Sequence, residues 1–193
     1  MTKSKWVQTS GKWYYLDANG YMVTNKWQKD SKGWVYVGED GAMVTNNWVQ
    51  DSKGWCYAGS DGYVITNCWK QIGGKWYYLN ANGNRLENTW QKDSKGWVYL
   101  GSDGAMLTNA WCEDSAGLCY VGSNGYAVTN TWKEHENGWV YLNSNGSMTK
   151  SKWVESKGKW YYLNENGYMV ENTSLTIGGV TYNFDANGVC TNK

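Results

Sequence analysis

A strict 21-residue period constrains the fold of this 193-residue chain more than any other feature of its sequence. Tryptophan recurs at this spacing without an insertion, at Trp6, Trp27, Trp48, Trp69, Trp90, Trp111, Trp132 and Trp153. A 21-residue unit cannot bury an apolar face by itself, so it must gain stability by stacking on its neighbours. The period therefore predicts a stacked-repeat protein instead of a single globular core.

Two further aromatic columns share this spacing. A second tryptophan column has Leu118 at its one vacant place and otherwise comprises Trp13, Trp34, Trp55, Trp76, Trp97, Trp139 and Trp160. The tyrosine column comprises Tyr15, Tyr36, Tyr57, Tyr78, Tyr99, Tyr120, Tyr141 and Tyr162. Residues 6–173 thus form eight repeats, residues 1–5 are interpreted as a leader, and residues 174–193 are a degenerate ninth repeat that is expected to cap the stack.

Each repeat has the pattern of a β-hairpin. In Trp13-Tyr14-Tyr15-Leu16, strand-forming residues alternate between two faces, and Trp6-Val7-Gln8 forms a second short strand upstream. Residues 9–12 supply the turn, and Asn19-Gly20 tolerates the positive φ of a tight connector. No segment shows a 3.6-residue period, so the predicted class is all-β: a solenoid of nine stacked hairpins.

A slower rhythm spans three repeats. The residue after the second tryptophan is Tyr14, Val35, Cys56, and then again Tyr77, Val98, Cys119. A superhelix with about three hairpins per turn would produce this pattern, and so would duplication of a three-repeat block.

Composition excludes several functions. The net charge is +1, from 18 basic and 17 acidic residues without a basic stripe, which argues against nucleic-acid binding. No stretch of about 20 apolar residues predicts membrane insertion. No CxxC motif occurs and His135 is the only histidine, so neither a metal nor a cofactor is expected. Leu, Ile and Val are sparse, so the 15 Trp and 16 Tyr are expected to supply most of the burial.

Stacked hairpins would bring two tryptophans of one repeat next to a tyrosine of its neighbour. Three ring faces form a notch that suits a quaternary ammonium ion, each contact contributing about 0.5–2 kcal/mol. The alternative interpretation is that the columns are only a structural core. Trp is rarely fully buried, and its abundance here exceeds what a seam between hairpins requires.

Sequence motifs also carry a family resemblance. The stretch GKWYYLDANGYMVTNKW and its near-copies at 74–83 and 158–167 resemble the choline-binding, or cell-wall-binding, repeat of Gram-positive surface proteins, autolysins and phage lysins. The resemblance extends from about Lys5 to the C-terminus. It implies a left-handed superhelix in which two Trp of one hairpin and an aromatic residue of the next enclose choline, often under a Met.

The resemblance implies a specific set of choline-binding residues. The tryptophan pairs would be Trp6/Trp13, Trp27/Trp34, Trp48/Trp55, Trp69/Trp76, Trp90/Trp97, Trp132/Trp139 and Trp153/Trp160. The third walls would be Tyr36, Tyr57, Tyr78, Tyr99, Tyr120 and Tyr162, and the lids Met22, Met43, Met106, Met148 and Met169. Leu118 should weaken a site at Trp111, and Arg85 places a like charge near the site around the fourth repeat.

The same resemblance implies a non-catalytic module that attaches a secreted protein to the bacterial cell wall. Its partners would be choline or phosphocholine groups on teichoic or lipoteichoic acid, bound with multivalent avidity, and dimerisation through a terminal repeat is a further expectation. Acidic residues lie at equivalent turn sites such as Asp30, Asp51 and Asp93, which indicates solvation instead of catalysis. The alternatives are a glucan-binding repeat module and a structural stalk of an adhesin or toxin.

Two of the five cysteines are expected to face each other. In the predicted register Val7 lies opposite Tyr14, and the equivalent pair of the sixth repeat is Cys112 and Cys119, which could form a disulfide. Free thiols are the alternative. Cys56, Cys68 and Cys190 have no evident partners.

Overall fold

A computed structural model describes residues 5–193, and the part of the leader at residues 1–4 lies outside them. Eighteen strands form nine antiparallel hairpins within this range, which contains no helix. The strands are β1 (Lys5–Thr9), β2 (Lys12–Leu16), β3 (Lys26–Lys29), β4 (Trp34–Val37), β5 (Asn47–Asp51), β6 (Gly54–Ala58), β7 (Cys68–Ile72), β8 (Lys75–Leu79), β9 (Thr89–Lys92), β10 (Trp97–Leu100), β11 (Ala110–Asp114), β12 (Gly117–Val121), β13 (Thr131–His135), β14 (Gly138–Leu142), β15 (Lys152–Ser156), β16 (Lys159–Leu163), β17 (Thr173–Ile177) and β18 (Val180–Phe184).

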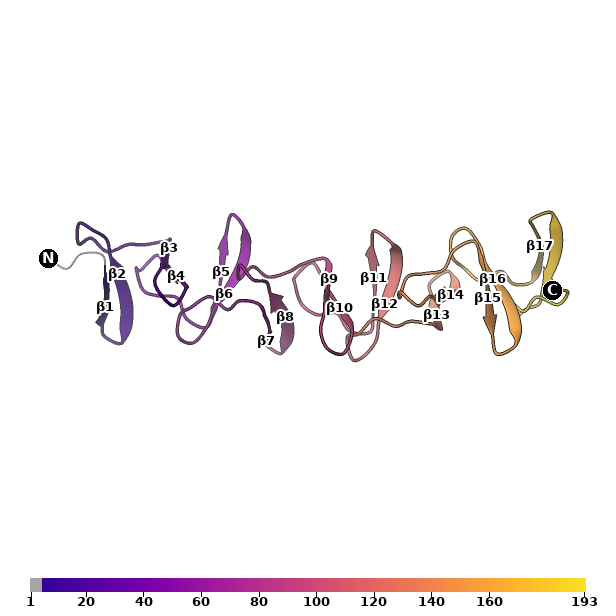
Figure 1. Ribbon diagram of the computed structural model, residues 1–193, viewed down its shortest axis with the longest axis horizontal. Helices are drawn as coiled ribbons and strands as arrows, with labels where there is room; N and C mark the ends of the chain where they lie inside the picture. The colour runs from indigo at the N-terminus through magenta and orange to yellow at the C-terminus, as the bar shows by residue number, and fades with distance from the viewer. Residues whose placement is uncertain (1–4) are drawn as a thin grey trace. The chain divides into compact units, whose positions relative to one another are not determined.

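The all-β class and the stack of hairpins are confirmed. Each strand pairs only with its sequence neighbour, as the successive ribbon pairs in Figure 1 show. No helix between residues 5 and 193 is long and apolar enough to cross a membrane.

Turn chemistry sets the hairpin register. In the first hairpin Ser10 and Gly11 have φ of 49° and 77°, and a two-residue turn with two positive φ values matches the twist of the strands it joins. This turn places Val7 opposite Tyr14, as the sequence predicts. The second hairpin instead closes over the four residues 30–33, and Asp30 Oδ1 accepts the backbone N–H of Lys32 at 2.8 Å.

The connector after each hairpin returns to the hairpin before it. The second strand ends at a turn, and the connector then runs beside the preceding repeat: Met43 N–H donates to the Trp13 carbonyl at 2.7 Å. Equivalent bonds of 2.6–2.9 Å join Val64 to Trp34, Arg85 to Trp55, Met106 to Trp76, Ala127 to Trp97, Met148 to Leu118, Met169 to Trp139 and Cys190 to Trp160. These bonds fix which connector covers which tryptophan.

The side chains with the smallest exposed fractions are aliphatic. One column follows the second tryptophan by three residues, and Leu79, Leu100, Leu142 and Leu163 of this column are fully buried. Alternation along the second strand places this residue and the one after the tryptophan, such as Val98, on the same inward face. The sparse aliphatic residues are therefore concentrated where the hairpins stack, and most aromatic rings remain partly exposed.

The chain divides into two compact units, residues 5–88 with Leu100–Met106, and Thr89–Tyr99 with Leu107–Lys193. Hairpins stack in the same way within each unit. The handedness and the number of hairpins per turn stay predictions.

The three-repeat rhythm is visible in the polar interactions. Tyr63 Oη donates to Asp30 at 2.6 Å, and 63 positions later Tyr126 Oη donates to Asp93 at 2.8 Å. Lys12 pairs with Asp40 at 3.1 Å, and Lys75 pairs with Asp103 at 3.0 Å. Local environments therefore recur every third hairpin, as expected from either a superhelix or a duplicated block.

Candidate functional site

The tyrosine column packs against the first tryptophan of its own hairpin. The two residues are directly opposed across the strands, and their rings meet edge to face at 5.0–5.3 Å and 62–77°. The pairs are Trp6–Tyr15, Trp27–Tyr36, Trp48–Tyr57, Trp69–Tyr78, Trp90–Tyr99, Trp111–Tyr120, Trp132–Tyr141 and Trp153–Tyr162. The structure therefore gives these tyrosines a contact inside their own repeat, which orients the first tryptophan.

The second tryptophan column is mostly exposed. The exposed fractions of its members are 41% for Trp13, 48% for Trp34, 42% for Trp76, 49% for Trp97 and 44% for Trp139. A ring needed only for the core would be buried. Five large apolar surfaces are therefore presented to solvent at equivalent places in the first, second, fourth, fifth and seventh repeats.

A different tyrosine reaches the first tryptophan from the next hairpin. Tyr77 lies 5.1 Å from Trp48, Tyr161 lies 5.0 Å from Trp132, and Tyr182 lies 4.8 Å from Trp153, all edge to face. These are the residues that directly follow the second-tryptophan position. They were not predicted as walls from the sequence. The signal for them was a tyrosine directly after the second-tryptophan position, which most repeats lack.

The predicted lids lie over the hairpin that precedes their own. The backbone bonds of the connectors place Met43, Met106 and Met169 over second tryptophans, whereas Met148 lies over Leu118. Met22 follows the first hairpin that the structure describes and is 50% exposed, so within residues 5–193 it has no preceding tryptophan pair to cover.

The seventh hairpin has the most complete notch. Trp132, Trp139, Tyr161 and Met169 line a pocket of about 370 Å³ on its surface. Glu171 and Lys157 also line this pocket, so the charge of the carboxylate is opposed by that of a lysine. Three aromatic rings and a thioether form an environment that favours a cation with apolar substituents.

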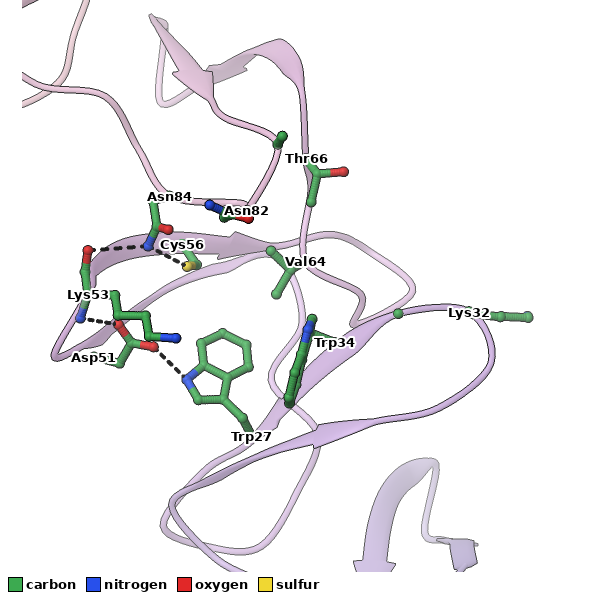
Figure 2. A pocket seen from close by; sticks show the side chains of 12 residues that line it. Trp27, Lys32, Trp34, Asp51, Lys53, Cys56, Val64, Thr66, Asn82 and Asn84 are labelled. Carbon is green, nitrogen blue, oxygen red and sulfur yellow. Dashed lines mark hydrogen bonds between the residues drawn. The ribbon is translucent and has the colours of Figure 1, made fainter.

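The notch of the second hairpin is larger. Its pocket of about 530 Å³ has Cys56 where other repeats supply a tyrosine. Figure 2 shows the Trp27 and Trp34 rings on one side of the pocket and Asn84 on the other. Trp27 Nε1 donates to Asp51 Oδ2 at 2.8 Å, which holds the indole in place without an aromatic neighbour from the next repeat. Its counterpart 63 positions later is the 2.6 Å bond from Trp90 to Asp114.

These hydrogen bonds correct the interpretation of the turn carboxylates as groups that serve only solvation. Asp51 orients a tryptophan, and Asp30 accepts a hydrogen bond from Tyr63, which lies in the connector that follows the next hairpin. The Tyr63 hydroxyl lowers the pKa of Asp30, and the carboxylate in turn raises the pKa of Tyr63 from 10.0 to about 12.

The sixth hairpin departs from the others. With Leu118 in place of tryptophan, Trp111 instead contacts His135 of the next hairpin edge to face at 4.8 Å. Cys112 lies directly opposite Cys119, which confirms the predicted register. Their sulfurs are 3.0 Å apart and the structure holds both residues as free thiols; the disulfide stays a prediction, with free thiols as the alternative.

All five cysteines are free, and burial raises the pKa of Cys56. Within residues 5–193 no group of three or more His, Cys, Asp or Glu side chains is arranged to hold a metal ion.

Comparisons with known proteins show a consistent similarity. A family model described as a choline-binding repeat matches residues 128–174, and one described as a putative cell wall binding repeat matches residues 4–22, 25–43, 69–84 and 88–106. No curated protein sequence gives a significant match.

Solved structures of pneumococcal proteins have the same architecture. The choline-binding domain of CbpL from Streptococcus pneumoniae is 35% identical, with a TM-score of 0.68 over 100% of this chain and 99% of that domain. The modular autolysin LytC from Streptococcus pneumoniae, in complex with a synthetic peptidoglycan ligand, is 29% identical with a TM-score of 0.78. CbpJ from Streptococcus pneumoniae is 29% identical with a TM-score of 0.64, over 93% of this chain and 62% of that one. The present chain, 98% of which is matched, spans 42% of the autolysin and nearly the whole CbpL domain.

Proposed function

The chain belongs to the choline-binding repeat family, and from that membership we propose that it is a non-catalytic module that attaches to choline groups of a cell-wall polymer. The observation that carries this proposal is the notch of the seventh hairpin. Trp132 and Trp139 form two walls, Tyr161 forms the third, and Met169 closes the site.

A quaternary ammonium ion matches the chemistry of this notch. Its methyl groups donate no conventional hydrogen bonds, so aromatic faces can replace its hydration without leaving polar groups unsatisfied. Glu171 and Lys157 both line the pocket with opposite charges, so recognition of the cation rests on the aromatic faces. A primary ammonium would need three acceptors, which aromatic rings do not provide.

The other notches form a graded series under this proposal. The tryptophan pairs at Trp6/Trp13, Trp27/Trp34, Trp69/Trp76 and Trp90/Trp97 have Val or Cys at the position of Tyr161, so they offer two aromatic faces instead of three. Each missing face removes about 0.5–2 kcal/mol of cation–π attraction. We therefore assign the third wall to the tyrosine directly after the second-tryptophan position, and give Tyr36, Tyr57, Tyr78, Tyr99, Tyr120 and Tyr162 the role of orienting tryptophans.

Many weak notches would together give firm attachment. Single sites are expected to bind in the millimolar range, near −4 kcal/mol. A polymer bearing several phosphocholine groups, such as teichoic or lipoteichoic acid, raises the effective concentration at each further notch once the first is occupied. Such a module belongs on a secreted protein at the surface of a Gram-positive cell.

Glucan binding is a second candidate because of the notch at Trp27. Asp51, Asn82 and Asn84 surround its exposed rings and could meet sugar hydroxyls. Calorimetry and thermal melting with choline, ethanolamine and a soluble glucan separate the two functions. Heat release and a raised melting temperature with millimolar choline, but not with ethanolamine, support the proposal. A response to the glucan alone, or to none of the three, contradicts it.

A further inference from the structure

We propose that Arg85 is an internal ligand of the notch of the third hairpin, and that this notch is closed to choline in the native chain. The inference rests on the proposed function, because it concerns which of the aromatic notches are available to an external quaternary ammonium ion.

The guanidinium group lies inside a three-ring notch. Arg85 Cζ is 5.2 Å from the centroid of the Trp48 ring and 5.5 Å from that of Trp55. The two indoles stand nearly perpendicular, at 87° with centroids 6.5 Å apart, and Tyr77 contacts Trp48 from the next hairpin. Both distances are within the range of about 6 Å at which a cation is attracted to an aromatic face. Arg85 thus occupies the position that a quaternary ammonium would need.

Three further contacts hold Arg85 in this position. Its backbone N–H donates to the Trp55 carbonyl at 2.6 Å, as the lid residues of other repeats do. Its Nε donates to Glu87 Oε1 at 3.0 Å, so the charge that faces the rings is also paired with a carboxylate. The side chain crosses Gly104 so closely that a Cβ there would lie 2.5 Å from Arg85 Cδ. The arginine side chain is consequently only 13% exposed.

Filling of the notch changes the exposure of its second tryptophan. Trp55 is half-buried, whereas the tryptophans at the same position in five other hairpins are 41–49% exposed. Trp160 is likewise half-buried, and Lys193 Nζ lies 3.6 Å from the Trp153 ring and 3.9 Å from the Trp160 ring. Lys29 and Lys92 each lie over a second tryptophan alone, Trp34 at 5.5 Å and Trp97 at 5.6 Å, and leave it exposed. The two half-buried members of the column are those whose cation lies over both tryptophans of the hairpin.

Arg85 and Lys193 differ in how firmly they hold their notches. Lys193 is exposed, and no ion pair within residues 5–193 includes it. Its ammonium is strongly hydrated and sits on a flexible stem, so it is the weaker competitor. Arg85 has a weakly hydrated planar group anchored by Glu87 and Gly104. If only about a tenth of the molecules have this notch free of Arg85, the apparent affinity of the notch for choline falls about tenfold.

The seventh hairpin is a natural comparison for the third. Trp48, Trp55, Tyr77, Glu87 and Gly104 correspond to Trp132, Trp139, Tyr161, Glu171 and Gly188, and among these six positions only the lid differs, Arg85 against Met169. The rim also differs, with Ile72, Gly73, Ser102 and Asp103 in place of Ser156, Lys157, Ala186 and Asn187. Gly188 also lies under its lid, because a Cβ there would be 2.5 Å from Met169 Sδ. Exchanging the two lids therefore tests the proposal in both directions.

The experiment measures the number of choline equivalents bound per chain by isothermal calorimetry and equilibrium dialysis. Arg85→Met should raise that number by one, Met169→Arg should lower it by one, and the double exchange should restore the wild-type number. An unchanged number in folded Arg85→Met would overturn the proposal. If Arg85→Met does not fold, Met169→Arg carries the test, and an unchanged number there would also overturn it.

A measurement without choline separates this inference from the proposed function. Quenching of tryptophan fluorescence by acrylamide should increase in Arg85→Met, because Trp55 becomes exposed, and should decrease in Met169→Arg. If wild type binds no choline but these quenching changes occur, the proposed function fails while the internal contact stands. If quenching is the same in all three chains, Arg85 does not occupy the notch.

Discussion

Replacing Tyr161 by valine tests which tyrosine completes the notch of the seventh hairpin. Tyr161 reaches Trp132 from the next hairpin at 5.0 Å, whereas the adjacent Tyr162 contacts Trp153 of its own hairpin at 5.1 Å. Valine is a fair substitute because Val35 and Val98 occupy the position of Tyr161 in other repeats. We expect Tyr161→Val to weaken choline binding at this notch and Tyr162→Val to leave it unchanged.

The magnitude follows from the loss of one ring face out of three. A cation–π contact of about 0.5–2 kcal/mol corresponds to a dissociation constant raised by about 2- to 30-fold. Each variant also loses one edge-to-face pair of nearly equal geometry, at 63° for Tyr161 and 62° for Tyr162. Both should therefore lose about 0.5–1.5 kcal/mol of stability from that pair. The matched loss of stability makes Tyr162→Val the control.

The assay must report on one notch among several. The indole N–H resonances of Trp132 and Trp139, assigned by substitution, can be followed in a nitrogen-15 correlation spectrum during a choline titration. Equal weakening by the two variants, or no weakening by Tyr161→Val, would refute the assignment of the third wall.

Three further changes have defined outcomes. Trp139→Ala should abolish binding at one notch yet leave retention on a choline-bearing resin largely intact, because the remaining notches keep their avidity; complete loss of retention would contradict independent sites. Tyr63→Phe should lower the free energy of unfolding by about 1 kcal/mol at neutral pH, since its bond to Asp30 is only partly buried. That bond stabilises the fold between the unfolded pKa of Asp30, 3.8, and that of Tyr63, 10.0. In thermal melts, the difference in stability between Tyr63→Phe and wild type should therefore vanish as the pH falls through the lowered pKa of Asp30, and also as it rises through the Tyr63 pKa of about 12. A stability difference that does not depend on pH would exclude this hydrogen bond as its cause. Thiol labelling under denaturing conditions should find five free cysteines, whereas three labelled thiols would indicate a bridge. In the folded chain Cys119 should react slowly, because the hydrogen bond with Cys112 and then burial raise the pKa of its thiol.

The hairpins and their register were predictable because both depend on local sequence. The turn at Ser10-Gly11 and the alternation in Trp13-Tyr14-Tyr15-Leu16 determine which residues face each other, and the same spacing places Cys112 opposite Cys119. The period predicted nine such units, since each copy repeats the same short-range pattern.

The walls and lids of the notches were harder to predict because they depend on how one hairpin is rotated against the next. Whether Tyr77 or Tyr78 meets Trp48 depends on that rotation, and no local pattern specifies it. The sequence placed the charge of Arg85 near the site around the fourth repeat. The connector returns to the preceding hairpin, so Arg85 lies over Trp55 of the third.

The return of each connector has a consequence for shortened or lengthened versions of the chain. The third notch takes two tryptophans from its own repeat, Tyr77 and the lid from the next, and a supporting glycine, Gly104, from the repeat after that. A cut after any repeat would therefore remove the wall and lid of the last remaining hairpin and the support of the lid before it. Adding one internal repeat would add one whole site. The number of sites should therefore rise linearly with the number of repeats, always smaller than the number of hairpins by the incomplete site at the cut end.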